Sequence, residues 1–416
     1  MNKPTGSVII MSHYSFPGGS AAALRILNLA DGFARNDKKV HILSPYCSAS
    51  RREQLNNRYA DQVKVYYVFP KAKPIRLYND VLYKIKVSDH YYNIVKAIID
   101  KEDVELVYIY DGTSYLYYNK VSKYIRKNKV SLTFDITEMR DKNYQVNIWK
   151  WNYPASLKRN ISNIVLLPDY LLGKRIVLNR ASFFISISTI LGHSLSHYHK
   201  NMIVIPGFER FSPTKETVLK KDPKVIFMYV GSLIERDGPE ILNDLLTELK
   251  PYTNELEFRF IGKYMGKVES KILMEKFQNK FGVLVNSIGE VDENEIGNEL
   301  LKADVFVLPR KDTYEERCAF PTRLAEFLTL RKPVLLSPVG DIGMYLEDGQ
   351  DACHIVQGIN GGISQTSQNQ MIRLIKDNAF RKEIADNGYQ KGLRYFDNKV
   401  NAKKLLRMAN PEDLKN

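Results

Sequence analysis

Apolar runs of strand length alternate with longer amphipathic stretches over most of the chain. Residues 21–35 repeat apolar side chains at helical spacing, and residues 91–101 do the same. The runs between such helices are mostly apolar, which is typical of parallel strands buried on both faces. Regular alternation of strand and helix predicts right-handed crossovers and a parallel sheet. The strands expected in the first half span residues 7–11, 39–43, 63–68, 106–110, 132–136, 183–187 and 202–205.

The alternation stops after residue 205 and restarts at residue 225. Residues 206–224 are polar, charged and punctuated by proline, which is typical of an interdomain linker. Because 416 residues exceed one ordinary hydrophobic core, we expect an N-terminal domain over residues 1–205 and a C-terminal domain over residues 225–394. The second domain is expected to hold strands at 225–230, 256–261, 283–288, 305–308 and 333–336, and helices at 240–249, 270–281, 294–302 and 322–330.

The predicted fold class is α/β, with two Rossmann-like, doubly wound parallel sheets. Open sheets of this kind bind ligands beyond the carboxyl ends of their strands, where the strand order reverses. Two such sheets joined by one linker are expected to face each other across a cleft. The last amphipathic stretch, residues 395–416, has no strand after it, so its apolar side chains need burial elsewhere.

Composition indicates the class of protein and its compartment. The chain is 44% hydrophobic and 26% charged, as soluble globular proteins are. No apolar run approaches the roughly 18 residues of a membrane span, and the N-terminus leads directly into a strand-like run, so we expect neither a membrane helix nor a signal peptide. The three cysteines, Cys47, Cys318 and Cys353, match neither a disulfide framework nor a metal spacing. These features favour the cytoplasm.

Formal charge is distributed unevenly along the chain. The net charge is +14, and residues 1–205 carry 30 Lys and Arg against 15 Asp and Glu, whereas the rest carries 31 against 32. The basic excess points to a polyanionic partner of the N-terminal half, either nucleic acid or an anionic membrane surface. A solvated lysine-rich surface is the alternative. Trp149 and Trp151, set among basic residues, either seat a helix at a membrane interface or belong to the core.

The segment after the expected strand at 305–308 carries the most informative side chains. Arg310 follows the strand and is suited to a two-pronged, charge-assisted contact with phosphate. Pro321 suits the first position of the next helix, whose unpaired amides around Thr322 form a phosphate site. Glu326 lies one turn further on, where its carboxylate can accept hydrogen bonds from a ribose diol. One loop and one helix thus offer groups for both a pyrophosphate and a ribose.

This segment resembles the nucleotide-sugar glycosyltransferases of family 4, retaining enzymes of the GT-B architecture. Their signature has two glutamates eight residues apart, then a helix and a Gly-Lys-Pro-Val strand entry. Glu326 matches the second glutamate, residues 320–324 (FPTRL) resemble the Phe-Pro-Thr-Lys-Leu turn of one subgroup, and residues 331–334 (RKPV) match the strand entry. The first glutamate position falls on Cys318, with Glu316 near but out of register.

The glycine-rich segment at residues 15–20 (SFPGGS) looks like the N-terminal loop that in this family lies over the donor phosphates. Gly18 and Gly19 would let backbone amides approach a ligand closely. An ordinary turn is the alternative for a Gly-Gly pair on its own. The resemblance also implies that the helix expected at 395–408 crosses back to pack on the N-terminal domain.

Residues 229–238 (YVGSLIERDG) resemble the Val-Gly-Arg…Lys-Gly segment that opens the second domain of the family. Gly231 matches the glycine of that segment. Ser232 stands at its arginine position and Asp237 at its lysine position, which leaves Arg236 one place away. The cationic pair that usually contacts the pyrophosphate is therefore altered in this chain.

Two residues are expected on the acceptor side. Residues 135–138 (DITE) resemble the segment where relatives carry an acidic residue beside the acceptor, so Glu138 is a candidate. His13 follows the first strand and is a second candidate, with a surface or packing role as the alternative. No metal-ligand spacing occurs among His, Asp, Glu and Cys, and the family commonly works without a metal, so no metal is expected.

The resemblance implies a retaining glycosyltransferase that moves a sugar from a nucleotide-diphosphate donor to a hydroxyl of an acceptor. The acceptor is expected to meet the basic N-terminal domain, which indicates a lipid-linked or anionic glycan at the inner membrane face. Arg310 and Gly19 are expected to stabilise the departing diphosphate. The alternatives are an epimerase of similar architecture, a degenerate protein that only binds sugar nucleotides, and a basic nucleic-acid-binding protein, which would leave the donor segment unexplained. The expected donor-binding residues are Gly18, Gly19, Gly231, Ser232, Arg236, Arg310, Phe320, Pro321, Thr322 and Glu326.

Overall fold

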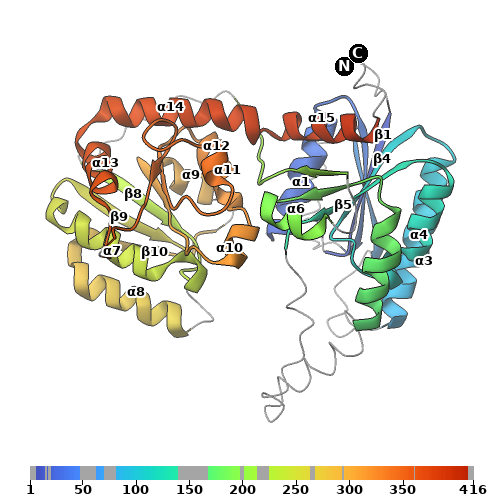
Figure 1. The fold of residues 1–416 in the computed structure, drawn as a ribbon, viewed down its shortest axis with the longest axis horizontal. Coiled ribbons are helices and arrows are strands. Elements are labelled where there is room, and N and C mark those ends of the chain that lie inside the picture. The colour runs from blue at the N-terminus through green and yellow to red at the C-terminus, as the bar shows by residue number, and fades with distance from the viewer. Residues whose placement is uncertain are drawn as a thin grey trace, which may run out of the picture. The chain divides into compact units, whose positions relative to one another are not determined.

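The computed structural model describes residues 6–14, 16, 20–46, 62–69, 81–138, 167–196, 201–212, 224–262, 268–292, 295–359 and 361–410. The chain divides into two compact units (Figure 1): unit 1 comprises Met1–Arg210 with Asn398–Asn416, and unit 2 comprises Phe211–Asp397. Each unit is built around a parallel sheet, which confirms the predicted fold class. Gly18, Gly19, Trp149 and Trp151 lie outside the described residues.

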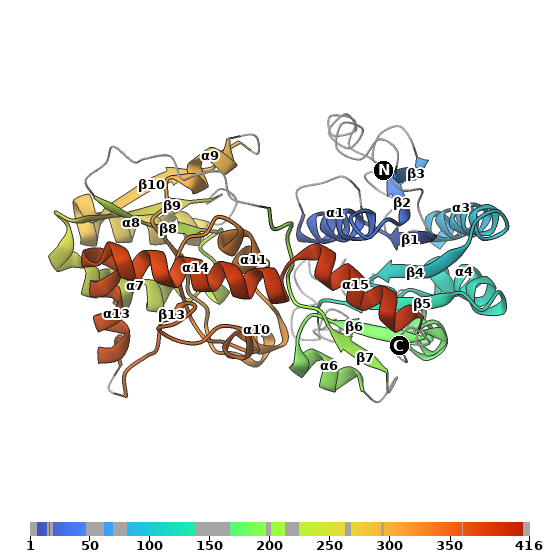
Figure 2. The same cartoon turned by 90° about the horizontal axis from the view of Figure 1, so that it is seen from above.

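Unit 1 holds a seven-stranded sheet of order β3-β2-β1-β4-β5-β6-β7, so the strand order reverses between β1 and β4. The helices α1 and α15 pack against one face, while α3 and α4 lie side by side against the other (Figure 2). The strands are β1 (Ser7–Ser12), β2 (Lys39–Tyr46), β3 (Val63–Phe69), β4 (Val104–Tyr110), β5 (Ser131–Ile136), β6 (Phe183–Ser186) and β7 (Met202–Val204). The helices are α1 (Ala21–Ala34), α3 (Val81–Ile99), α4 (Tyr115–Lys127), η4 (Gly173–Val177), η5 (Leu178–Arg180), α6 (Thr189–Leu195) and α15 (Asn398–Ala409).

The hydrophobic pattern explains these elements. Every residue of β1 is buried, because helices cover both faces of the sheet. The helix α1 begins where the Ser20 hydroxyl accepts a hydrogen bond from the Ala23 amide at 3.2 Å, a standard N-cap. Its apolar stripe, which includes Ile26 and Phe33, is fully buried in the unit 1 core.

The last helix, α15, belongs to unit 1. Its Ala402 and Leu405 are buried in the same core as the residues of α1. The side-chain amide of Asn398 donates from Nδ2 to Asp31 Oδ2 on α1 at 2.8 Å, which fixes the start of the helix. The helix begins at Asn398, three residues later than expected, because Tyr395 ends the preceding helix α14 in unit 2.

A buried ion pair extends unit 1 to Arg210, beyond the expected linker start at residue 206. Arg25 on α1 donates from Nε to Asp135 Oδ2 at 2.5 Å, and Tyr108 donates to the same carboxylate. The Arg25 guanidinium also donates to the Pro206 carbonyl at 2.8 Å and lies over the Phe208 ring at 4.7 Å. These contacts tie the chain after β7 to the core. The expected linker therefore begins inside unit 1.

Unit 2 holds a six-stranded sheet of order β10-β9-β8-β11-β12-β13, with the reversal between β8 and β11. The strands are β8 (Val225–Val230), β9 (Leu256–Ile261), β10 (Val285–Gly289), β11 (Val305–Leu308), β12 (Val334–Leu336) and β13 (Cys353–His354). The α-helices are α7 (Pro239–Leu249), α8 (Val268–Phe281), α9 (Ile296–Leu301), α10 (Tyr314–Cys318), α11 (Thr322–Thr329), α12 (Ile342–Tyr345), α13 (Gln365–Lys376) and α14 (Asn378–Tyr395), and the 3₁₀ turns are η6 (Glu235–Asp237), η7 (Lys250–Tyr252) and η8 (Gly282–Leu284).

The structure of unit 2 differs from expectation at several elements. The residues at 283–284 form the end of η8, so the strand expected from 283 begins at Val285. The expected polar loop before residue 321 contains the helix α10, and the elements β13, α12, α13 and α14 were not predicted. Within the described parts of the chain, no helix is long and apolar enough to cross a membrane.

Candidate functional site

The candidate donor residues gather at the reversal of strand order in unit 2. The strands β8 and β11 are neighbours, and both end at the carboxyl edge of the sheet. Gly231 and Ser232 follow β8, while Arg310 follows β11. This is the position at which open parallel sheets bind their ligands.

The turn after β8 is held by its own side chains. The Tyr229 hydroxyl accepts a hydrogen bond from the Leu233 amide at 3.2 Å and donates to Asp237 Oδ2 at 2.9 Å. A side chain at Gly231 would meet the Tyr229 hydroxyl at 2.5 Å, so the glycine is required for close packing. The Asp237 carboxylate also accepts from the Ile234 amide at 3.1 Å. Asp237, at the lysine position of the resembling family, therefore stabilises the turn and supplies no cation.

Arg310 is a buried cation in the loop after β11. Its Nη2 lies 2.8 Å from Glu316 Oε2 on α10, and both side chains are about one-tenth exposed (8% and 10%). The Arg310 amide donates to Ser337 Oγ at 3.0 Å, which fixes the backbone. Burial lowers the pKa of the Arg310 guanidinium, the negative charge of Glu316 opposes that shift, and Arg236 adds to it.

The negative charge of Glu316 is balanced mainly by the positive charge of Arg310. Although its Oε2 forms the 2.8 Å ion pair, that contact does not have hydrogen-bond geometry, and within the described structure this oxygen has no hydrogen-bond donor. A buried carboxylate in this state is costly unless a cation stays close. The only signal for Glu316 in the sequence is its nearness to the first motif position, and that position itself holds the buried Cys318.

The turn after β8 and the loop after β11 are joined. The Lys311 amide donates to the Arg236 carbonyl at 3.2 Å. The Lys311 ammonium lies 3.1 Å from Glu240 and 3.5 Å from Glu235, so its charge is directed to these carboxylates. The Arg236 side chain is 59% exposed, which leaves its guanidinium in contact with solvent near Arg310.

The start of α11 differs in detail from expectation. Pro321 occupies the N-cap position, and the first helical residue is Thr322, which is exposed. The ring of Phe320 is buried among aromatic side chains, 5.6 Å from the Phe396 ring and 5.9 Å from the Tyr345 ring. The Phe320 side chain is therefore engaged in packing and offers only its backbone to a phosphate, whereas the exposed Thr322 also offers its hydroxyl group.

Glu326 lies in the middle of α11, and its side chain is 37% exposed. Arg323 Nη1 approaches Glu326 Oε2 at 3.4 Å. Desolvation raises the pKa of Glu326 although part of its surface is open to solvent, and the Arg323 charge opposes the shift. The carboxylate is thus partly enclosed by protein and still accessible to a ligand.

The candidate acceptor residues of unit 1 lie at the same edge of their sheet. His13 follows β1, beside the reversal, and its Nε2 is 3.7 Å from Asp111 Oδ2 after β4. His13 also stacks on the Tyr117 ring with centroids 5.8 Å apart. Asp111 has a φ of 56°, a left-handed conformation that non-glycine residues seldom adopt outside functional or tightly constrained positions. Glu138 is exposed two residues after β5.

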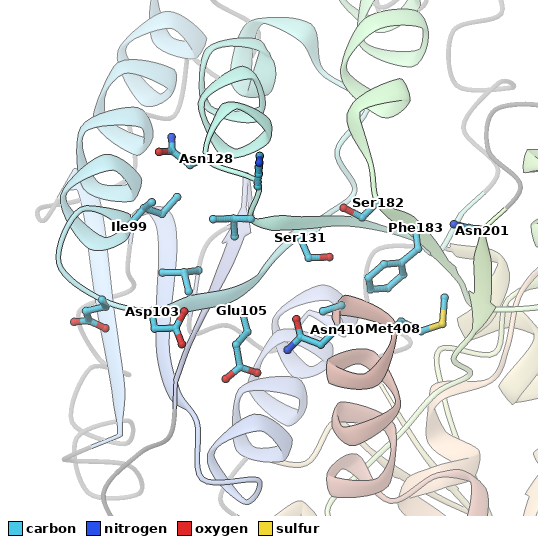
Figure 3. Close-up of a pocket in the computed structure, with 15 residues that line it drawn as sticks. Ile99, Asp103, Glu105, Asn128, Ser131, Ser182, Phe183, Asn201, Met408 and Asn410 are labelled. Carbon is cyan, nitrogen blue, oxygen red and sulfur yellow. The ribbon is translucent and has the colours of Figure 1, made fainter. Parts of the chain in front are cut away.

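A cavity of about 930 Å³ lies at the opposite edge of the unit 1 sheet, beside the start of β5 (Figure 3). Ser131, Ser182, Phe183 and Met408 are among the residues that line it. Because Ser131, Ser182 and Phe183 precede or begin their strands, the cavity is separate from the strand ends that carry His13 and Glu138. Among the described residues, no group of three His, Cys, Asp or Glu side chains is placed to hold a metal ion.

Comparisons with known proteins show which chains this one is similar to. Residues 211–391, which make up most of unit 2, match the family model of glycosyl transferases group 1. The chain is also similar to TuaC of Bacillus subtilis (strain 168), which is named as a teichuronic acid biosynthesis glycosyltransferase. The identity is 26% over 268 residues, which cover 61% of this chain and 63% of TuaC. The match thus spans less than two thirds of that relative.

The fold is similar to those of solved glycosyltransferase structures. Sucrose-phosphate synthase from Thermosynechococcus elongatus has a TM-score of 0.63 at 15% identity, covering 99% of this chain and 100% of that one. HepE from Anabaena, in complex with UDP, has a TM-score of 0.61 at 15% identity, covering 98% and 99%. TarM has a TM-score of 0.65 at 12% identity, covering 98% and 99%. Because the sequence identities are 15% or lower, these similarities show a shared fold and nothing further.

Proposed function

We propose that the chain transfers a sugar from a nucleoside diphosphate donor to a hydroxyl group of a cell-surface glycan or glycolipid precursor. The observation that supports this proposal most strongly is the buried guanidinium of Arg310. It lies where the strand order of the unit 2 sheet reverses, within the residues that match the glycosyl transferases group 1 family. Negative charge develops on the departing diphosphate, and a preorganised cation in a site of low dielectric stabilises it strongly. A buried arginine at this position is suited to that role, and the proposed transfer reaction rests on it.

The other site residues have proposed roles around the same donor. Arg236 contacts the pyrophosphate from solvent, and the amides near Gly231, Ser232 and Thr322 donate to phosphate oxygens. Phe320 and Pro321 shape the turn and contribute through their backbone. Glu326 accepts hydrogen bonds from the ribose. Gly18 and Gly19 are proposed to close over the phosphates by family resemblance, and Gly19 and Arg310 together stabilise the leaving group.

Retention of anomeric configuration is proposed on the same resemblance. No metal is required in this scheme, because the arginines supply the positive charge that a divalent cation would otherwise provide. The acceptor hydroxyl is proposed to bind beside His13 and Glu138. The functions named for TuaC and the UDP complex of HepE favour a nucleotide-sugar donor and a cell-surface product. We place the reaction in the cytoplasm, peripheral to the inner face of the membrane.

A protein that binds nucleotide sugars without transferring them is the second candidate. It is favoured by Cys318, which is buried where the resembling family has a glutamate, and by Asp237, which is engaged in the β8 turn. Both candidates predict binding, and only the transferase predicts release of nucleoside diphosphate with incorporation of sugar into an acceptor.

A thermal-shift screen with UDP-, GDP- and ADP-sugars tests the proposal. A ligand at one hundred times its dissociation constant stabilises the folded state by about 2.7 kcal/mol, so a true donor should raise the melting temperature clearly. We expect one nucleotide class to do so. If every nucleotide sugar leaves the melting temperature unchanged, the proposed donor site is wrong.

Replacing Glu326 by alanine is expected to weaken binding of the selected nucleotide by about 1–3 kcal/mol, because a hydrogen bond to a charged group is lost. Titration calorimetry with the nucleoside diphosphate measures the effect. Glu275→Ala is the matched control, since Glu275 lies on α8 with its side chain 57% exposed. Equal affinities of wild type and a folded Glu326→Ala protein would remove Glu326 from the site.

A further inference from the structure

The cavity at the edge of the unit 1 sheet where the strands begin has a mostly polar lining (Figure 3). Its volume is about 930 Å³, and nine of its fifteen lining residues have polar side chains. Pockets of roughly 300–1,000 Å³ hold ligands of drug size, and most of them have an apolar lining. The cavity thus has the size of a ligand site without the usual apolar character, which suits a ligand that carries many polar groups.

Three helices of unit 1 end at this cavity. Ile99 is the last residue of α3, Asn128 caps the end of α4, and Asn410 directly follows α15 (Figure 3). The last carbonyl groups of an α-helix have no partner within the helix, and together they carry a partial negative charge. The cavity therefore offers acceptors to a ligand that donates hydrogen bonds, and it disfavours an anion such as phosphate.

Side chains of the lining add groups that both donate and accept hydrogen bonds. The amides of Asn128, Asn201 and Asn410 each contain a donor and an acceptor. Ser131 begins β5, and its Oγ is buried without a hydrogen-bond partner among the described residues. Leaving a buried hydroxyl group without a partner destabilises the folded state, and rotation about one side-chain torsion reorients it. A ligand hydroxyl group in the cavity would supply the partner that Ser131 lacks.

One carboxylate of the lining is held by its neighbours in the sheet. Glu102 accepts hydrogen bonds from Ser7 Oγ at 2.6 Å and from His41 Nε2 at 2.9 Å, and it pairs with Lys39. Burial raises the pKa of Glu102, but the hydrogen bonds from Lys39, Ser7 and His41 outweigh burial and lower the pKa to about 2. Glu102 therefore stays ionised, and the charge of Lys39 balances it.

The remaining charges of the lining balance as well. Glu105 Oε1 lies 2.5 Å from Lys38 Nζ, and both side chains are 13% exposed. Asp103 and Lys129 are exposed and carry opposite charges. Together with the pair of Glu102 and Lys39, three carboxylates thus accompany three ammonium groups, and their net formal charge is zero. Without a field of one sign, the cavity has no strong attraction for a polyanion or a polycation.

The cavity is one strand length away from the candidate acceptor residues. Val104 lines the cavity and begins β4, whereas Asp111 follows the last residue of the same seven-residue strand. At about 3.3 Å per residue, such a strand is roughly 20 Å long. A ligand in the cavity would therefore leave the edge that carries His13 and Asp111 open.

We propose that this cavity binds a neutral oligosaccharide. Its hydroxyl groups donate to the helix carbonyls and accept from the asparagine amides, and the balanced charge of the lining matches a ligand without charge. The proposal goes beyond the proposed function and rests on it only for its purpose. In a transferase, the cavity would hold a distal part of a glycan whose reacting end lies at the other edge of the sheet.

Saturation-transfer NMR with the full chain tests this binding. The probes are three neutral trisaccharides: maltotriose, cellotriose and chitotriose. We expect transfer of saturation from the protein to at least one of them. Spermidine and inorganic phosphate should not displace the bound sugar, because the cavity favours neither charge. The nucleoside diphosphate selected by thermal shift should not displace it either, since the proposed donor site lies in unit 2.

Variants of two lining residues locate the bound sugar. Ser131→Leu places a larger side chain in the cavity and should abolish the transfer signal. Asn410→Leu changes a residue outside the sheet and should weaken binding about two- to tenfold, the effect of one lost hydrogen bond. Asn298→Leu is the matched control, because Asn298 is exposed on α9 in unit 2, and it should bind as wild type does. Melting temperatures show which variants fold, and Asn410→Leu decides if Ser131→Leu does not.

The proposal is overturned by absence of transfer to all three sugars, by equal binding in wild type and a folded Asn410→Leu protein, or by displacement with phosphate or spermidine. Nucleotide binding by both cavity variants should match wild type. A chain that binds a trisaccharide in the cavity but no nucleotide sugar would refute the proposed function and leave this site intact. A chain that binds a nucleotide sugar but none of the trisaccharides would refute only the cavity site.

Discussion

Replacing Arg310 by alanine should lower turnover by about 10²–10³-fold, the range found when one preorganised donor to a developing negative charge is removed. The structure adds a second consequence. Glu316 would be left buried without its cation, and breaking a buried ion pair in this way costs about 3–5 kcal/mol of stability. Loss of activity in this variant alone therefore does not separate a direct role from unfolding.

A double variant separates the two effects. In Arg310→Ala with Glu316→Gln, no unpaired carboxylate remains, so the melting temperature should recover most of its loss while turnover stays low. Arg317→Ala is the control, because Arg317 pairs with Asp312 at the surface and is 50% exposed. Recovery of turnover together with stability in the double variant would make Arg310 a structural residue.

Replacing Arg25 by methionine should destabilise unit 1 by about 3–5 kcal/mol, since Asp135 is fully buried and would lose its cationic partner, keeping only the hydrogen bond from Tyr108. The carbonyls of residues 205 and 206 would lose donors as well. Urea unfolding measures the change, with Arg126→Met as the exposed control on α4. Arg25→Met with Asp135→Asn should recover part of the loss. A single variant within about 1 kcal/mol of wild type would show that the ion pair contributes little.

The central strands of both sheets could be predicted because helices bury both of their faces, so each reads as an apolar run bounded by polar residues. The strand β1 is such a case. The helices α13 and α14 were missed because their exposed faces are polar and no strand pattern follows them. The boundary of unit 1 was missed for another reason. Arg25 binds a chain segment about 180 residues away, and no local pattern reports such a contact.

In the candidate site too, some features could be predicted from local sequence and others depend on packing. Arg310 and Glu326 were predicted from their positions after a strand and on the following helix, and Gly231 was predicted from the resemblance. The pairing of Arg310 with Glu316 depends on how α10 folds back, which spacing alone does not determine. The role of Asp237 in the β8 turn likewise becomes visible only with the Tyr229 hydroxyl in place. Local sequence thus indicated where charges lie, and packing determined which of them are engaged.

Hydrogen exchange of the full chain, with and without the nucleotide sugar selected by thermal shift, tests the central claim most directly. Binding of the donor at the strand-order reversal of unit 2 should slow exchange in the amides of residues 229–238 and 309–326, because those amides would donate to the ligand or be covered by it. Peptides lining the cavity at the opposite edge of unit 1, such as those around Ser131 and Ser182, should be unaffected. Protection confined to unit 1, with none in either segment of unit 2, would contradict the account.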